Sequence, residues 1–245
     1  MAPEGAKPMK RIAYIARTGE EELARMAHFM DRNGILLEGL GLDETGPHQY
    51  DLSGYDGVVI LGDPQGGQRQ AFRDRIMDSV REAVDKNIPV LGISAGARLL
   101  AEICRDSVDA GVPGKAVWSR FRLSEEGRKD IIFFGVSESF SVIREYGDAF
   151  IVPSGSATLA VSDRGTTAAF RYHNAYGLEF TPLLRGSLSG VSVSDQTNIS
   201  PVDEPALQEL LSLGRTIFGN FLWLIEVRCS SKTVRRGDAA EPAAT

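Results

Sequence analysis

The sequence predicts an α/β fold in which a mostly parallel sheet is covered by helices on both faces. In the first half of the chain, short apolar runs alternate with stretches whose apolar residues recur at helical spacing. In the second half, short strand-like runs follow one another with turn residues between them. We therefore expect antiparallel strands to extend the parallel sheet in the C-terminal half.

The individual elements follow from the same two patterns of spacing. In the first half we predict strands at 11–16, 35–40, 57–61 and 89–93, and helices at 20–33 and 71–86. In the second half we predict strands at 116–122, 140–143, 158–161, 167–170 and 175–180, and a closing helix at 205–227. All of these elements fit a single domain.

The two ends of the chain differ from this body in composition. Residues 1–9 and 231–245 are rich in Ala, Pro, Glu, Gly and Lys and have no apolar periodicity. We therefore expect one domain over residues 10–230 between two disordered ends.

Composition excludes several classes of function. The net charge is −6 and the pI is near 5.2, which argues against a nucleic-acid partner. The two cysteines, Cys104 and Cys229, form no disulfide framework and lack the spacing of metal ligands, so we predict no metal and no cofactor. We find no apolar run near the roughly 20 residues that span a bilayer, and Met1–Arg11 lacks a secretory signal. The protein is expected to be cytoplasmic, with no membrane partner.

A strand–turn–helix motif is the strongest chemical signal. Gly92–Gly96 has the pattern Gly-x-Ser-x-Gly and lies between an apolar run and a helical pattern, which places Ser94 on a tight turn beside a helix N-terminus. A serine at this position needs a base to become a nucleophile. The three histidines, His28, His48 and His173, occupy no evident base position. Ser94 is therefore a nucleophile, a hydrogen-bonding group for a ligand, or a structural residue.

Four stretches taken in order resemble class I glutamine amidotransferase domains, nearest the stand-alone type related to the amidotransferase half of GMP synthase. They are Tyr55–Pro64, Val90–Leu100, Gly147–Pro153 and Ala169–Pro182. The resemblance covers about residues 10–227 and implies a flavodoxin-like, doubly wound domain. In that family, glutamine is hydrolysed through a cysteine thioester, with a histidine base oriented by a glutamate.

This chain departs from the family at all three catalytic positions. The resemblance places Ser94 at the cysteine, Thr181 at the histidine and Leu183 at the glutamate. Glutaminase activity is therefore not expected. Backbone amides near Gly62, Asp63 and Ala95 would still receive developing negative charge, although Asp63 replaces a glycine of the family pattern.

Charged residues replace neutral ones around the same pocket. By the resemblance, Arg98 and Glu179 both stand at glutamine positions, and Arg144 and Tyr146 belong to the stretch that is rich in histidine in the family. We expect Arg98 to bind a carboxylate or a phosphate, with Arg144 and Thr181 also lining the site. Glu179 would act as a general acid or base, with Tyr146 as a second proton donor. The alternative is that Arg98 and Glu179 simply form a structural ion pair.

Three functional hypotheses remain open. The first is a repurposed enzyme that performs acid–base chemistry of the lyase, isomerase or cyclase type on a small acidic metabolite. The second is an inactive pseudoenzyme that binds a metabolite or a protein partner, and the third is a serine hydrolase that uses Ser94. A homo-oligomer is compatible with each of them, and the fold alone cannot choose between them.

Overall fold

A computed structural model describes most of the predicted body. The described residues are 9–15, 29–40, 50–61, 70–105, 113–146, 151–182 and 204–237. Of the predicted helix 20–33, only the part from residue 29 lies inside these ranges. Gly62, Asp63 and Leu183 lie outside them.

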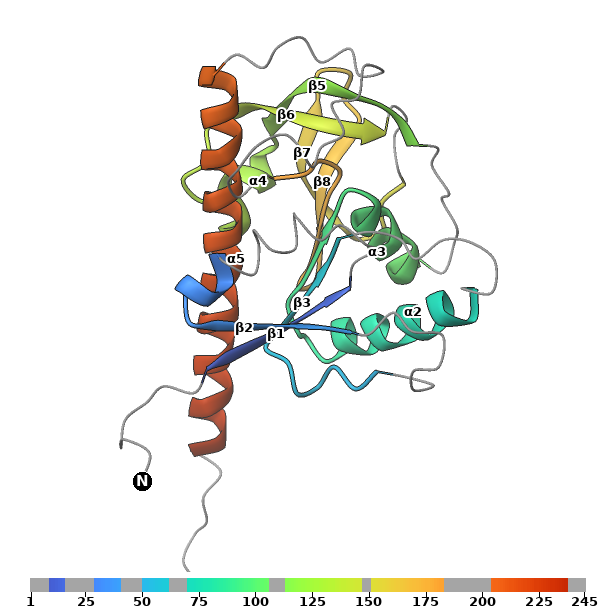
Figure 1. Cartoon of the computed structure of the whole chain (residues 1–245), viewed down its shortest axis with the longest axis vertical. Helices are drawn as coiled ribbons and strands as arrows, with labels where there is room; N and C mark the ends of the chain where they lie inside the picture. Colours follow the sequence, from blue (N-terminus) through green and yellow to red (C-terminus); the bar gives the residue numbers. More distant parts are fainter. Residues whose placement is uncertain are drawn as a thin grey trace, which may run out of the picture.

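Nine strands form one sheet in the order β2-β1-β3-β4-β9-β8-β7-β5-β6 (Figure 1). The first five strands in this order are parallel to one another. They are β2 (Ile35–Gly39), β1 (Lys10–Ile15), β3 (Gly57–Ile60), β4 (Val90–Ile93) and β9 (Ala175–Leu178). β3 and β4 are buried along their whole length, as expected for parallel strands covered on both faces.

The other four strands extend the sheet by antiparallel pairing. They are β8 (Thr167–Tyr172), β7 (Ala157–Ser162), β5 (Pro113–Leu123) and β6 (Ser139–Tyr146). β5 and β6 cross over the ends of β7 and β8 in Figure 1. The sheet therefore has a parallel and an antiparallel half, as the sequence predicts, and they meet at β9.

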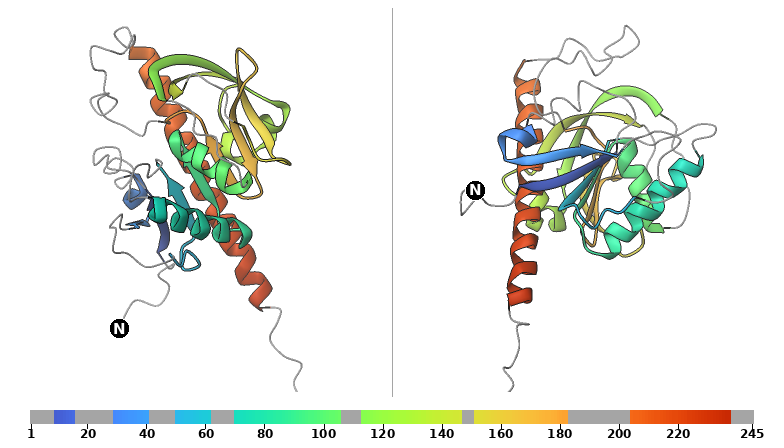
Figure 2. Two further views of the ribbon diagram at one scale, coloured as in Figure 1. Left: turned by 90° about the vertical axis from the view of Figure 1, so that its right-hand side faces the viewer. Right: turned by 60° about the horizontal axis from the view of Figure 1, so that its bottom comes forward.

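Helices cover both faces of the sheet. α2 (Gln70–Asp85) and α3 (Ala95–Arg105) lie on one face and the long α5 (Glu204–Gly237) on the other (Figures 1 and 2). Successive residues of β3 belong to different cores, since Val58 and Ile60 pack with the α2–α3 side and Val59 with the α5 side. The predicted doubly wound arrangement is confirmed.

Two short helical elements were not predicted from the sequence. They are α4 (Glu125–Lys129) and η2 (Ile131–Phe133), which connect β5 to β6. Ser124 begins α4 by accepting a hydrogen bond from the Gly127 amide at 2.9 Å, and Asp130 begins η2 by accepting one from the Ile132 amide at 3.0 Å. Both elements are too short for apolar periodicity to reveal them.

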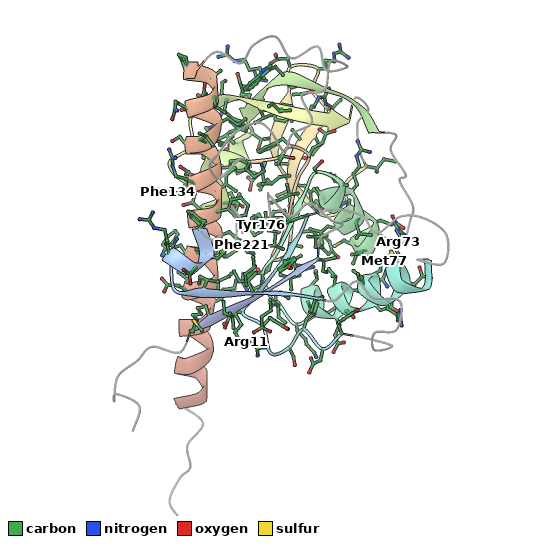
Figure 3. The ribbon with its side chains drawn as sticks, viewed as in Figure 1. Arg11, Arg73, Met77, Phe134, Tyr176 and Phe221 are labelled. Atoms are coloured by element: carbon green, nitrogen blue, oxygen red, sulfur yellow. The ribbon has the colours of Figure 1, made fainter. Side chains whose placement is uncertain are left out.

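α5 is longer and more apolar than the sequence prediction allowed. Its segment Pro205–Arg228 is long and apolar enough to cross a membrane, so the expectation that no run approaches that length is wrong. However, 56% of the most apolar window is buried inside the fold. Figure 3 shows Phe221 of α5 and Tyr176 of β9 near each other between helix and sheet, and both belong to one core. α5 therefore packs as a core helix, and it continues past residue 230 to Gly237.

Candidate functional site at the end of β4 and β9

The predicted tight turn is present at Ser94. Its φ of +53° lies in the left-handed region, which a residue with a side chain rarely adopts. The Ser94 amide donates to the Leu178 carbonyl at 2.8 Å, and the Ser94 carbonyl accepts from the Ala97 amide at 3.0 Å. α3 begins at Ala95, so its first amides, which have no acceptor within the helix, lie beside the serine.

The two glycines of the motif let α3 approach the sheet. A Cβ on Gly96 would lie 2.2 Å from the Ile60 carbonyl oxygen, and a Cβ on Gly92 would lie 2.6 Å from the Gly96 carbonyl oxygen. Neither distance is compatible with a side chain unless the backbone moves. The glycines therefore fix the position of the first turn of α3, and with it the direction of Ser94.

Glu179 lies beside Ser94 because the two residues directly follow neighbouring parallel strands. Ile93 of β4 pairs with Leu178 of β9, and both strands end there. The Glu179 side chain is fully buried. The next residue, Phe180, is also fully buried, with its ring 5.6 Å from that of Phe121. Packing of Phe180 in the core thus holds the glutamate at the carboxyl end of the parallel strands.

Two arginines approach the buried carboxylate from different parts of the fold. Arg98, one turn into α3, places Nη2 3.5 Å from Glu179 Oε1. Arg144 on the edge strand β6 places Nη1 3.6 Å from Glu179 Oε2. The side chains of Arg98 and Arg144 are only 6% and 10% exposed. The structure thus contains the Arg98–Glu179 pair that the sequence left as an alternative, and adds Arg144 to it.

The geometry of this cluster is looser than that of another buried ion pair, which joins α2 to α3. Arg73 binds Glu102 of α3 through two nitrogens, at 2.9 and 2.5 Å, in the fork that arginine forms with carboxylates. Arg98 approaches Glu179 through one nitrogen, at the upper limit of a direct hydrogen bond, and Arg144 through one nitrogen that lies beyond this limit. The Glu179 cluster therefore lacks the tight bidentate contact of the structural pair.

The remaining predicted site residues are only partly placed. Thr181 is half-buried. β9 ends at Leu178, so the prediction of a strand that continues to Phe180 is wrong. The direction of the Thr181 side chain therefore cannot be inferred from alternation along that strand. The chain bends after Leu178 because Phe180 turns into the core. Ala95 is half-buried at the start of α3. Tyr146 is the last residue of β6, but its side chain, like Gly62 and Asp63, lies outside the described parts.

No described histidine is placed to activate Ser94. His173 lies in the turn between β8 and β9, at the amino end of β9, whereas Ser94 lies at the carboxyl end. Four strand residues separate the two ends, which corresponds to roughly 13 Å. His28 and His48 lie outside the described residues. Within the same ranges, no group of three or more His, Cys, Asp or Glu residues is placed to hold a metal ion.

Comparison with solved structures identifies the fold. A glutamine amidotransferase from Thermotoga maritima superposes with a TM-score of 0.68 at 20% identity, covering 88% of this chain and 99% of that one. A putative GMP synthase subunit from Thermoplasma acidophilum gives a TM-score of 0.59 at 20% identity, covering 94% and 99%. A glutamine amidotransferase from Methylobacillus flagellatus gives 0.65 at 13% identity, covering 87% and 93%.

The sequence itself matches no protein-family profile and no curated protein. The structural likeness therefore establishes a glutamine amidotransferase-like fold, whereas the activity depends on the residues at the site.

Proposed function

We propose that this chain is a glutamine amidotransferase-like protein without glutaminase activity, which binds a small acidic metabolite at Ser94 and acts on it by acid–base chemistry. The proposal rests on one observation: a fully buried glutamate lies directly beside the serine turn, flanked by two arginines. By the sequence resemblance, serine and threonine occupy the cysteine and histidine positions. Neither Ser94 nor Thr181 supplies the thiolate or the imidazole that glutamine hydrolysis needs.

The positive charges of Arg98 and Arg144 favour an acidic ligand at the site beside Ser94. A carboxylate of the metabolite would bind Arg98 in the bidentate fashion that Glu179 does not achieve. Glu179 would then exchange one arginine contact for a contact with the ligand. A carboxylate brought against the substrate in this way is positioned to accept a proton from it.

The turn at Ser94 would stabilise the charge that this proton transfer leaves on the substrate. The first amides of α3 lie beside Ser94, carry the positive end of the helix dipole and would donate to a ligand bound there. The Ser94 hydroxyl would add one hydrogen bond without forming a covalent bond. Loss of one such donor typically costs about 2.7–4 kcal/mol of transition-state stabilisation. The bond that finally breaks, and hence the choice among lyase, isomerase and cyclase, depends on the substrate.

A second candidate, a pseudoenzyme that only binds a metabolite or a protein partner, is favoured by the same ion pair. If Glu179 stays paired with Arg98 when the ligand binds, the carboxylate does not contact the ligand and cannot accept its proton, so binding occurs without turnover. Among the described residues, no observation favours a serine hydrolase, because His173, the one histidine they include, lies at the opposite end of β9 from Ser94. We also propose that the protein works in the cytoplasm without metal or cofactor.

A ligand screen on matched variants tests the proposal. Small carboxylic acids, phosphates and amino acids are screened by thermal shift, and turnover is followed by mass spectrometry. Ser94→Ala should weaken binding of an acidic ligand, and Glu179→Gln should abolish its conversion. Glu102→Gln is the matched control, because it disrupts a buried Arg–Glu pair between α2 and α3, away from the turn, and should retain both activities.

Each outcome bears on one part of the proposal. Hydrolysis of glutamine by the wild-type protein would overturn it. Binding that is lost in Ser94→Ala, with no turnover in any variant, would favour the pseudoenzyme. Conversion that survives Glu179→Gln but not Ser94→Ala would overturn the acid–base role of Glu179 and favour the hydrolase.

A further inference from the structure

Arg144, which contacts Glu179, also lines a cavity that is rich in arginine. A cavity of about 260 Å³ is bounded by β5, β6 and the turn that joins β7 to β8. Its lining includes Arg120 of β5, Arg144 of β6 and Arg164 of the turn, together with Trp118 and one carboxylate, Asp163. Three arginines around so small a cavity form an excess of positive charge.

Two of these three arginines have no acidic partner within the described parts of the chain, whereas Arg144 contacts Glu179. Within the described residues, neither Arg120 nor Arg164 forms an ion pair, and both residues are exposed at the rim. Arg144 directs Nη1 toward Glu179, while its buried Nε has no hydrogen-bond partner within the same described parts. A buried guanidinium donor without an acceptor is costly, so Arg144 would gain a hydrogen bond if its guanidinium turned toward a ligand in the cavity.

Strand register and the turn hold these groups in place. Phe121 of β5 pairs with Ser162, the last residue of β7, and Val117 pairs with Arg144, so the lining residues of β5 lie between these two pairs. In the turn, Ser162 Oγ accepts hydrogen bonds from the amides of Arg164, at 3.3 Å, and Thr166, at 3.2 Å. The backbone that carries Arg164 is therefore fixed before any ligand arrives, which lowers the entropic cost of binding.

We propose that this cavity binds the phosphoryl group of a small phosphate-bearing molecule. Arginine forks match the geometry of phosphate oxygens, and two cations without ion pairs suit a dianion better than a single carboxylate. The Trp118 ring offers an apolar surface beside the anion for the rest of the molecule. This site does not depend on chemistry at Ser94, but Arg144 belongs to both places. A phosphate that binds Arg144 is therefore expected to loosen its contact with Glu179.

The test uses the fluorescence of the tryptophan that lines the cavity. The chain has two tryptophans, and Trp223→Phe leaves Trp118 as the only one. Inorganic pyrophosphate is titrated into this variant at constant ionic strength, with calorimetry as a second measurement. We expect saturable binding, weakened at least tenfold by Arg120→Gln and by Arg164→Gln.

Arg122→Gln is the matched control. Arg122 is exposed two residues along β5 from Arg120, and it does not line the cavity. It should bind pyrophosphate like the Trp223→Phe parent. Absence of saturable binding by both methods, or an equal loss in Arg122→Gln, would overturn the proposal, because the second result would mean that general surface charge attracts the anion. Circular dichroism checks that each variant is folded before it is titrated.

Discussion

At the scale of single residues, Glu179 carries the strongest prediction about stability. Glu179→Gln removes the only negative charge of the described cluster while Arg98 and Arg144 stay buried. Breaking a buried ion pair from one side typically costs about 3–5 kcal/mol. We expect the free energy of unfolding, measured with urea, to fall by that amount.

The control for this prediction is an exposed ion pair between α4 and the residue that precedes β6. Glu138 pairs with Arg128 at 2.7 Å, but its side chain is 63% exposed. Exposed pairs contribute about 0–1 kcal/mol, so Glu138→Gln should change stability little. Similar small losses in both variants would mean that Glu179 is more accessible to water than its burial indicates.

The family resemblance predicted Arg98, Arg144 and Glu179 as site residues and left open an Arg98–Glu179 pair, but it did not predict the contact between Arg144 and Glu179. The Gly-x-Ser-x-Gly pattern is local, and the turn at Ser94 follows from it directly. The approach of Arg144 to Glu179 is not local, because β6 and β9 are separated by three strands in the sheet order. That contact depends on how the antiparallel half curves, a property that no short stretch of sequence specifies.

At the scale of elements, the first turn of α3 depends on close contact with the sheet. Gly96→Ala would force a Cβ against the Ile60 carbonyl, and overpacking of this kind typically costs about 1–3 kcal/mol. Gly219 in α5 is a matched glycine, since its added Cβ would meet no atom within 4 Å. Gly219→Ala should therefore stabilise the protein by about 0.5–1 kcal/mol. Thermal unfolding of both variants measures these opposite signs, and a loss of stability in Gly219→Ala would contradict the exposed position of that glycine.

Element type was predicted better than element length. Alternating and helical apolar patterns identified the described strands and the long helices, because each pattern reports which face is buried. α4 and η2 were missed because their starts depend on single capping side chains, Ser124 and Asp130. β9 ends before the predicted position because Phe180 packs in the core, and the alternating apolar pattern of a strand does not indicate this packing.

At the scale of the whole molecule, α5 connects the parallel and antiparallel halves of the sheet. Ile225 of α5 lies so close to Gly57 of β3 that a Cβ on Gly57 would be 2.6 Å from Ile225 Cδ1. Earlier in the same helix, Asn220 donates to the carbonyls of Ile132 and Phe134 at 3.0 and 2.8 Å, which connects α5 to η2. One helix therefore stabilises both halves.

This arrangement gives a test that separates a core helix from a membrane anchor. Phe221 is fully buried in the core beneath α5, whereas Trp223 on the same helix is 50% exposed and contacts only the ring of Phe134 among described aromatic residues. If α5 belongs to the core, Phe221→Ala should lower the free energy of unfolding by about 3–5 kcal/mol. Trp223→Ala should cost about 1 kcal/mol or less, because half of that side chain is already in water. If α5 were instead a membrane anchor, Phe221→Ala would leave the free energy of unfolding of the rest of the domain almost unchanged in detergent-free solution. Urea unfolding of the two variants beside the wild-type protein therefore tests whether the apolar face of α5 stabilises this fold.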